Sequence, residues 1–189
     1  MRKSLLLSSV IMLFFGCSKQ DDRVIVKETW NNEQPEVVIY KTIDDKNTYY
    51  EIRFDSLGRI MNITPYSEGK LNGTQISFSG KSGLGVGALL PFIDGKKEGF
   101  VYEFYEGQQT VFKGKFKEDK FNGVNTLFYE NGNILSTGIT INDMREGEWT
   151  EYYENGKVKA KGTYKNGEKQ LDWIYLNIDG TPDTTQKEH

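Results

Sequence analysis

Residues 147–158 read GEWTEYYENGKV, and residues 162–167 continue with GTYKNG. Apolar and polar residues alternate on both sides of Asn155-Gly156, which is the pattern of two strands joined by a tight turn. Asn166-Gly167 supplies a second turn signal farther along. The stretch therefore predicts a hairpin with strands over 148–153 and 158–164, and a second reversal into the residues that follow.

The same pattern returns along the chain with a period of 24 residues. Segments that begin at residues 99, 123, 147 and 171 read GFVYEFYEG, GVNTLFYENG, GEWTEYYENG and LDWIYLNIDG. Inside the units, Gly114, Gly138 and Gly162 keep the same step. One hairpin cannot bury its own face, whereas stacked hairpins can. We therefore predict an all-β fold in which tandem β-hairpin repeats of about 24 residues form an extended, twisted antiparallel sheet or solenoid.

Dipeptides that favour tight turns lie between the alternating segments of this repeat. Asn-Gly also occurs at 72–73, 122–123 and 131–132, and Asp-Gly occurs at 94–95 and 179–180. A type I′ turn needs positive φ at both central residues, which Asn, Asp and Gly tolerate best. Each of these pairs therefore predicts a hairpin turn.

The chain divides into five segments. An apolar run that ends at the one cysteine, Cys17, resembles the signal of bacterial lipoproteins, which implies a lipoprotein signal peptide over 1–16 and a lipidated cysteine and tether over 17–23. Degenerate β-hairpin repeats are expected over 24–98. Clear repeats follow over 99–180, and a polar tail over 181–189 is expected to be disordered.

The N-terminus has the composition of an export signal. Arg2 and Lys3 precede an apolar run over 4–15 that is too short to span a bilayer core of about 30 Å. Gly16-Cys17 ends this run and resembles the lipobox of bacterial lipoproteins. That resemblance implies cleavage before Cys17 and its lipidation, which anchors the chain in the outer membrane. The Lys/acidic run over 18–22 resembles a surface-export signal, so the periplasmic and the cell-surface leaflet both stay open.

Composition narrows the possible chemistry. The chain contains one Cys and one His, His189, and has a net charge of −3. A disulfide framework, a zinc finger, His-dependent catalysis and general nucleic-acid binding are therefore disfavoured. The Gly-rich run over 80–87 lacks the spacing of a phosphate-binding motif. We expect a protein that is not an enzyme, without a cofactor and without a metal site.

Residue parity separates two faces of the predicted sheet. One face carries large apolar residues at equivalent positions, such as Phe78, Phe104 and Phe128. The other is expected to be the wetter face, and its aromatic residues either pack as cross-strand ladders or form a platform for a glycan or a protein. These candidate binding residues are Tyr105, Tyr129, Trp149, Tyr153, Trp173 and Tyr175.

The unit at 147–167 closely resembles the MORN repeat variant of bacterial proteins, a family that includes proteins described as YwqK-like antitoxins. The resemblance implies a protein-interaction or scaffolding module, and the antitoxin name implies pairing with a toxin. Three roles stay open at this point: a lipid-anchored module that binds an envelope protein, an accessory lipoprotein that binds carbohydrate, and an antitoxin-like or immunity-like partner of a toxin.

Overall fold

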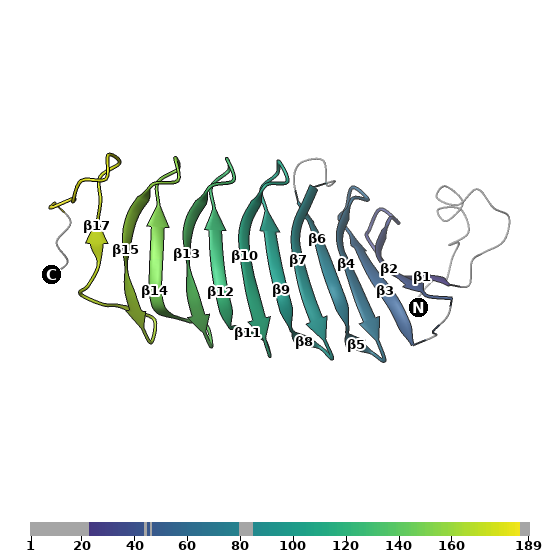
Figure 1. The fold of residues 1–189 in the computed structure, drawn as a ribbon. Helices are drawn as coiled ribbons and strands as arrows, with labels where there is room; N and C mark the ends of the chain where they lie inside the picture. The colour runs from purple at the N-terminus through teal and green to yellow at the C-terminus, as the bar shows by residue number, and fades with distance from the viewer. Residues whose placement is uncertain (1–22, 44, 46, 80–84, 186–189) are drawn as a thin grey trace.

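The computed structural model describes residues 23–43, 45, 47–79 and 85–185. The described residues contain 17 β-strands and no helix, and all the strands belong to one sheet. The sheet is a single layer, and its strands stand side by side in chain order from β1 at one end to β17 at the other (Figure 1). The prediction of an all-β fold built from repeated hairpins is confirmed.

Neighbouring strands pair antiparallel throughout. The strands are β1 (Val24–Thr29), β2 (Pro35–Lys41), β3 (Thr48–Phe54), β4 (Ile60–Ser67), β5 (Lys70–Leu71), β6 (Gly73–Ser79), β7 (Gly85–Ile93), β8 (Lys96–Lys97), β9 (Gly99–Phe104), β10 (Thr110–Lys117), β11 (Lys120–Phe121), β12 (Gly123–Phe128), β13 (Ile134–Ile141), β14 (Met144–Tyr152), β15 (Val158–Lys165), β16 (Glu168–Lys169) and β17 (Ile174–Tyr175).

Tight turns line one edge of the sheet. Both central residues of each turn have positive φ, as a type I′ turn requires. The pairs are Glu68-Gly69, Asp94-Gly95, Glu118-Asp119, Asn142-Asp143 and Asn166-Gly167. The turn amides also bond to the preceding unit: Asp143 N–H donates to the carbonyl of Phe121 at 3.1 Å, and Phe121 N–H donates to the Asp143 carboxylate at 2.7 Å. Successive turns are therefore tied together along this edge.

Longer turns line the opposite edge, and here the Asn-Gly prediction is only partly right. In the turn after β14, Tyr153 N–H donates to Lys157 O and Gly156 N–H donates to Tyr153 O, both at 2.8 Å. Only Gly156, with φ of 82°, has positive φ. Asn155 instead uses its side-chain oxygen to accept a bond from Lys157 N–H at 3.0 Å. The side-chain bond thus replaces the left-handed backbone expected at the Asn.

Two further Asn-Gly pairs bend a strand without reversing it, so the prediction of hairpin turns there is wrong. Asn122-Gly123 lies between β11 and β12, and both of these strands pair antiparallel with β10. Gly123 has φ of 138°, and Asn122 N–H donates to Lys115 O at 2.8 Å. Asn72-Gly73 occupies the same place between β5 and β6, which both pair with β4.

The core lies on one side of the single layer. Apart from Pro65, every buried strand residue in the described chain has the same parity as Trp149, as the pairing register shows. We call this side the inner face and the opposite side the outer face. The buried apolar side chains are Val37, Phe92, Val101, Phe116, Trp149, Ala160 and Trp173. Buried residues recur along the sheet, and Trp149, Ala160 and Trp173 pack together as a cluster near its C-terminal end.

The C-terminal end differs from the disordered tail expected over 181–189. Pro182 forms a bridge with Leu176, and Asp183 N–H donates to Tyr175 O at 2.9 Å. Residues 181–185 therefore lie against the last strand and cover part of its open edge. Residues 186–189 lie outside the described residues.

Candidate functional site

The three predicted tyrosines form a ladder between successive units. Each lies at the start of a long turn, is half-buried, and donates its hydroxyl to a main-chain carbonyl of the next hairpin. The bonds are Tyr105 to Phe128 at 3.0 Å, Tyr129 to Tyr152 at 2.8 Å and Tyr153 to Leu176 at 2.8 Å. The hydroxyls hold adjacent hairpins together, which is the packing alternative considered for these residues.

Tyr129→Phe is expected to lower the free energy of unfolding by about 1–2 kcal/mol, since it removes this bond and leaves the Tyr152 carbonyl without its partner. Thermal or urea unfolding measures the change. Tyr50→Phe on the outer face, where the side chain is 39% exposed, is the matched control and should change stability by less than about 0.5 kcal/mol. Equal effects of the two variants would contradict the ladder.

Trp149 and Trp173 lie deeper, with only 3% and 8% of their surface exposed. Their Nε1 atoms donate to Ile139 O and Thr163 O respectively, both at 3.0 Å. The expectation that this face is the wetter one is therefore wrong. Trp149 lies in β14 and Trp173 just before β17, and Gly138 and Gly162 leave room for their respective indole rings.

Cations cover both indoles. The Arg145 guanidinium lies 4.4 Å from the Trp149 ring centre, and Lys169 Nζ lies 3.9 Å from that of Trp173. Lys169 also donates to the hydroxyl of Tyr175 at 2.8 Å. Flat stacking of a sugar needs an open ring face, and cations already occupy these faces. The burial and the cation contacts remove the geometric basis for a carbohydrate platform at Trp149 and Trp173.

Asn125 occupies the position in its unit that is equivalent to Trp149 in the next unit. Its Nδ2 donates to Thr140 Oγ1 at 2.9 Å, while its buried Oδ1 has no hydrogen-bond partner. Sequence analysis did not single out Asn125, although the 24-residue alignment places this polar residue between Val101 and Trp149 at equivalent positions.

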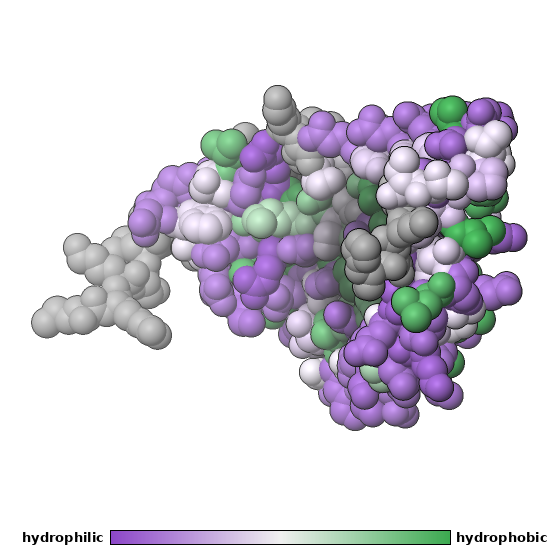
Figure 2. Space-filling model, turned by 90° about the vertical axis from the view of Figure 1, so that its left-hand side faces the viewer, coloured by the Kyte–Doolittle hydropathy of each residue, from purple (hydrophilic) through white to green (hydrophobic). Residues whose placement is uncertain are grey.

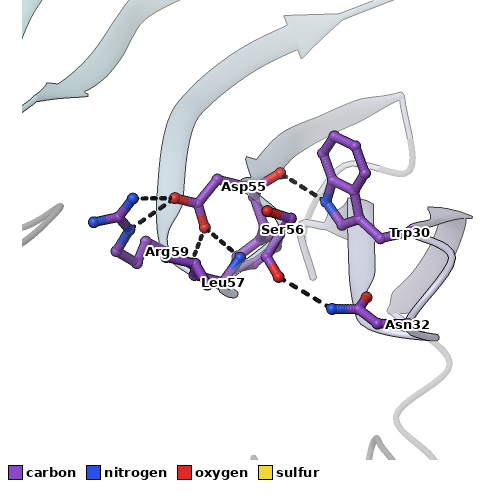
Figure 3. A network of polar contacts seen from close by, with 7 residues as sticks. Trp30, Asn32, Asp55, Ser56, Leu57 and Arg59 are labelled. Carbon is purple, nitrogen blue, oxygen red and sulfur yellow. Dashed lines mark hydrogen bonds and ion pairs between the residues drawn. The ribbon is translucent and has the colours of Figure 1, made fainter.

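The start of the degenerate repeats predicted over 24–98 has the same geometry as the ladder. Trp30 Nε1 donates to Phe54 O at 3.2 Å, and Asn32 Nδ2 donates to Ser56 O at 3.1 Å. Figure 3 shows both side chains directed at the next turn, where the Asp55 carboxylate accepts bonds from the amides of Leu57 and Arg59. A tryptophan thus takes the place of the tyrosine, which sequence similarity alone shows only faintly.

Main-chain donors lower the pKa of two turn carboxyls. The Arg59 amide is the main cause at Asp55, helped by the Arg59 guanidinium 2.7 Å away, and the Thr163 amide is the main cause at Asp172. Because the pKa of each group in the folded chain lies below its ordinary value of 3.8, the unfolded chain takes up these protons first as the pH falls.

The stability that these carboxyls contribute is therefore present above about pH 4 and lost as the pH falls through their folded pKa values. We expect the melting temperature to fall between pH 5 and pH 3, and to fall less in Asp55→Asn, which keeps the turn geometry without the charge. Melting curves across this range measure the effect. The same acid-induced fall in Asp55→Asn as in the wild type would contradict the assignment.

A shallow hollow on the outer face near the C-terminus is lined by Glu148, Lys161, Thr163, Asp172 and Ile174. The Asp172 carboxylate is held by Thr163, whose N–H and Oγ1 donate to it at 3.0 and 2.9 Å. In the described part of the chain, no group of three or more His, Cys, Asp or Glu side chains is placed to hold a metal ion.

The predicted lipidation site, Cys17, lies outside the described residues. Among the residues that the structure does describe, no helix is long and apolar enough to cross a membrane.

Comparison with known families identifies the repeat. A family model described as MORN repeat variant matches residues 121–142 and 145–166. Residues 121–166 contain MORN repeat variants. They comprise β11 to β15 and so include two tyrosines of the ladder and Trp149. The match confirms the resemblance seen in sequence over this part of the chain, and MORN repeats are generally interaction modules for proteins or membranes.

Other comparisons add little. No curated protein matches the chain. Two solved structures are similar over part of their length: TarM, with 16% identity and a TM-score of 0.28, and a point mutant of S. aureus TarM in complex with fondaparinux, alpha-GlcNAc-glycerol and UDP, with 15% identity and a TM-score of 0.30. They cover 62% and 66% of this chain, which spans only 20% and 21% of theirs.

Proposed function

We propose that this protein is a lipid-anchored interaction module of the bacterial envelope. Cys17 is the anchor in the outer membrane, residues 18–23 are the tether, and the sheet displays a surface to another envelope protein. The observation that carries the proposal is the open outer face: within the described chain every strand packs against its neighbours in the sheet, and no second layer covers it.

Hydrogen bonds between successive units make this surface rigid. Turn amides bond from unit to unit at one edge, and the Tyr129 and Tyr153 hydroxyls do so near the other. A sheet held at both edges keeps its twist, so side chains on the outer face stay at fixed spacing. Preformed surfaces lose less conformational entropy on binding, which suits a scaffold.

The experiment that tests the proposal compares the wild type with Cys17→Ala in the native envelope. Metabolic labelling with a fatty-acid analogue, membrane fractionation and cross-linked capture followed by mass spectrometry are run on both, with Ser18→Ala as the matched control. We expect the label and the membrane attachment in the wild type and in Ser18→Ala, and neither in Cys17→Ala.

One reproducible protein partner captured from the envelope supports the interaction role. An unlabelled wild-type chain overturns the anchor, and capture of carbohydrate or of a toxin in place of an envelope protein overturns the proposed partner class. Protease accessibility on intact cells then assigns the leaflet, because only a surface-displayed chain is cut from outside.

A further inference from the structure

The outer face of the N-terminal half carries an uninterrupted apolar row. The row crosses β2, β3, β4, β6, β7 and β9, and each residue lies directly opposite the next in the strand register. Its members are Val38, Ile52, Ile63, Ile76, Leu89 and Tyr102. Side chains directly opposite one another in adjacent strands touch, so these six form one continuous surface.

Apolar residues flank this row on both sides. Tyr50, which is 39% exposed, and Phe100, which is 52% exposed, lie on the side nearer the tight turns. Phe54 and Phe78 lie on the side nearer the long turns. We call the central row with these flanking residues the apolar patch. None of these residues is charged, and at the β9 end Lys113 Nζ lies 5.3 Å from the Phe100 ring centre and 5.7 Å from that of Tyr102.

The repeat itself does not require this patch. The same row continues across β10, β12, β13, β14 and β15 as Lys113, Thr126, Thr137, Thr150 and Lys161. The C-terminal half therefore folds with hydroxyl and ammonium groups at the equivalent positions. Figure 2 views the molecule from its C-terminal end and shows hydrophilic residues with separate hydrophobic ones among them. The exposed apolar residues on the outer face of this half, such as Val124 and Ile139, lie outside the row. An exposed apolar surface that the fold does not need is typical of an interface.

We propose that a second copy of this chain covers the apolar patch, so that two molecules pack outer face to outer face through β2 to β9. This rests on the proposed function in one respect, namely that the outer face is the interaction surface. Two sheets stack well when they share the same twist, with their strands about 30° apart. A second copy has the same twist by identity, and an apolar patch is complementary to itself.

The size of the patch fits a dimer. Six strands about 4.8 Å apart span about 29 Å, and three rows of side chains along the strands span about 20 Å. The plane area is therefore about 600 Å² per copy, or about 1,200 Å² in total, which reaches the lower bound of specific interfaces.

Charge also favours a face without ionic groups. Without Arg2 and Lys3, the chain that follows the proposed cleavage site has 22 basic and 27 acidic residues, a net charge of −5. Two such chains repel each other, so self-association has to come from apolar contact. Tilting the two sheets across each other leaves both polar C-terminal halves uncovered for other partners.

Cysteine cross-linking in the native envelope tests the dimer, because Cys17 is the only cysteine of the chain. Ile76→Cys places a thiol in the centre of the patch, and Thr150→Cys, in the same row of the polar half, is the matched control. A bis-maleimide that spans about 10 Å matches the distance between packed sheets. We expect Ile76→Cys to give at least ten times more dimer than Thr150→Cys.

A charge in the patch provides the second variant. Ile76→Lys should convert the detergent-solubilised dimer to a monomer in sedimentation, whereas Thr150→Lys should leave it dimeric. Both side chains are half-exposed on the face opposite the core, so the fluorescence of Trp149 and Trp173 checks that the fold is intact.

Equal cross-linking at both positions, or a dimer that persists in folded Ile76→Lys, overturns the proposal. Loss of a different captured protein in Ile76→Lys, without any homodimer, also overturns it and leaves the proposed interaction role standing. Failure of the anchor would appear separately, as an unlabelled soluble chain whose free Cys17 thiol cross-links in both cysteine variants, and Ile76→Lys in sedimentation would then decide the dimer.

Discussion

Gly138→Ala is expected to lower the free energy of unfolding by about 3 kcal/mol, although it adds a single methyl group. Gly138 lies directly opposite Trp149 in β14, and a Cβ there would lie under 3.0 Å from carbons of the indole ring. The ring cannot move aside, since Nε1 is bonded to Ile139 O and Arg145 covers the ring. For a chain of this length, the melting temperature should fall by about 6–12 °C.

A double-mutant cycle separates this clash from other effects of the substitution. Trp149→Ala alone should cost about 3–5 kcal/mol, because it empties a buried site. Adding Gly138→Ala to Trp149→Ala should then cost almost nothing, since the Cβ no longer meets a ring. Chemical unfolding of the four proteins measures the coupling. The same cost for Gly138→Ala in both backgrounds would contradict the packing described here.

The hairpin repeat is the part of the fold that the sequence predicts well, and the reason is local. The alternation in 148–153 and the turn chemistry of Asn155-Gly156 both act within a few residues. Repetition every 24 residues then strengthens each weak signal. The N-terminal unit, where the sequence pattern is weakest, has the same spacing: Trp30 Nε1 donates to the carbonyl of Phe54, 24 residues along the chain.

Turn types were less predictable, because similar dipeptides occupy different places. Asn166-Gly167 forms a type I′ turn, whereas Asn122-Gly123 bends a strand. The difference lies in pairing: Phe121 is already opposite Phe116 when the chain reaches Asn122. The local sequence alone does not determine which neighbouring strand a residue pairs with.

The sequence predicts which candidate site residues share a face, but not whether that face is buried. Parity places Trp149 and Tyr153 on one face, but it does not say which face becomes the core. That depends on Arg145 packing over Trp149 and on Gly138 lying against its ring, contacts that span up to 11 residues. The apolar patch likewise became visible only once the strand register aligned Ile63 with Ile76.

Removal of one whole unit should leave the fold intact. Deleting residues 123–146 takes out 24 residues and joins Asn122 to Gly147. By repeat equivalence, Thr150 then takes the place of Thr126 opposite Lys113. The Tyr105 hydroxyl then donates to the carbonyl of Tyr152 in place of that of Phe128. Stability in repeat proteins is close to a sum over units and interfaces, so we expect cooperative melting within about 10 °C of the full chain.

Deleting residues 124–146, one residue fewer, is the matched control. The strand register then slips by one, which moves every following side chain to the opposite face. Trp149 would point outward and the next residue along would point into the core. We expect this chain to lose cooperative melting and the fluorescence of buried tryptophan, which thermal scans and emission spectra of both deletions measure. Similar melting of the two chains would show that the 24-residue register does not hold the sheet together.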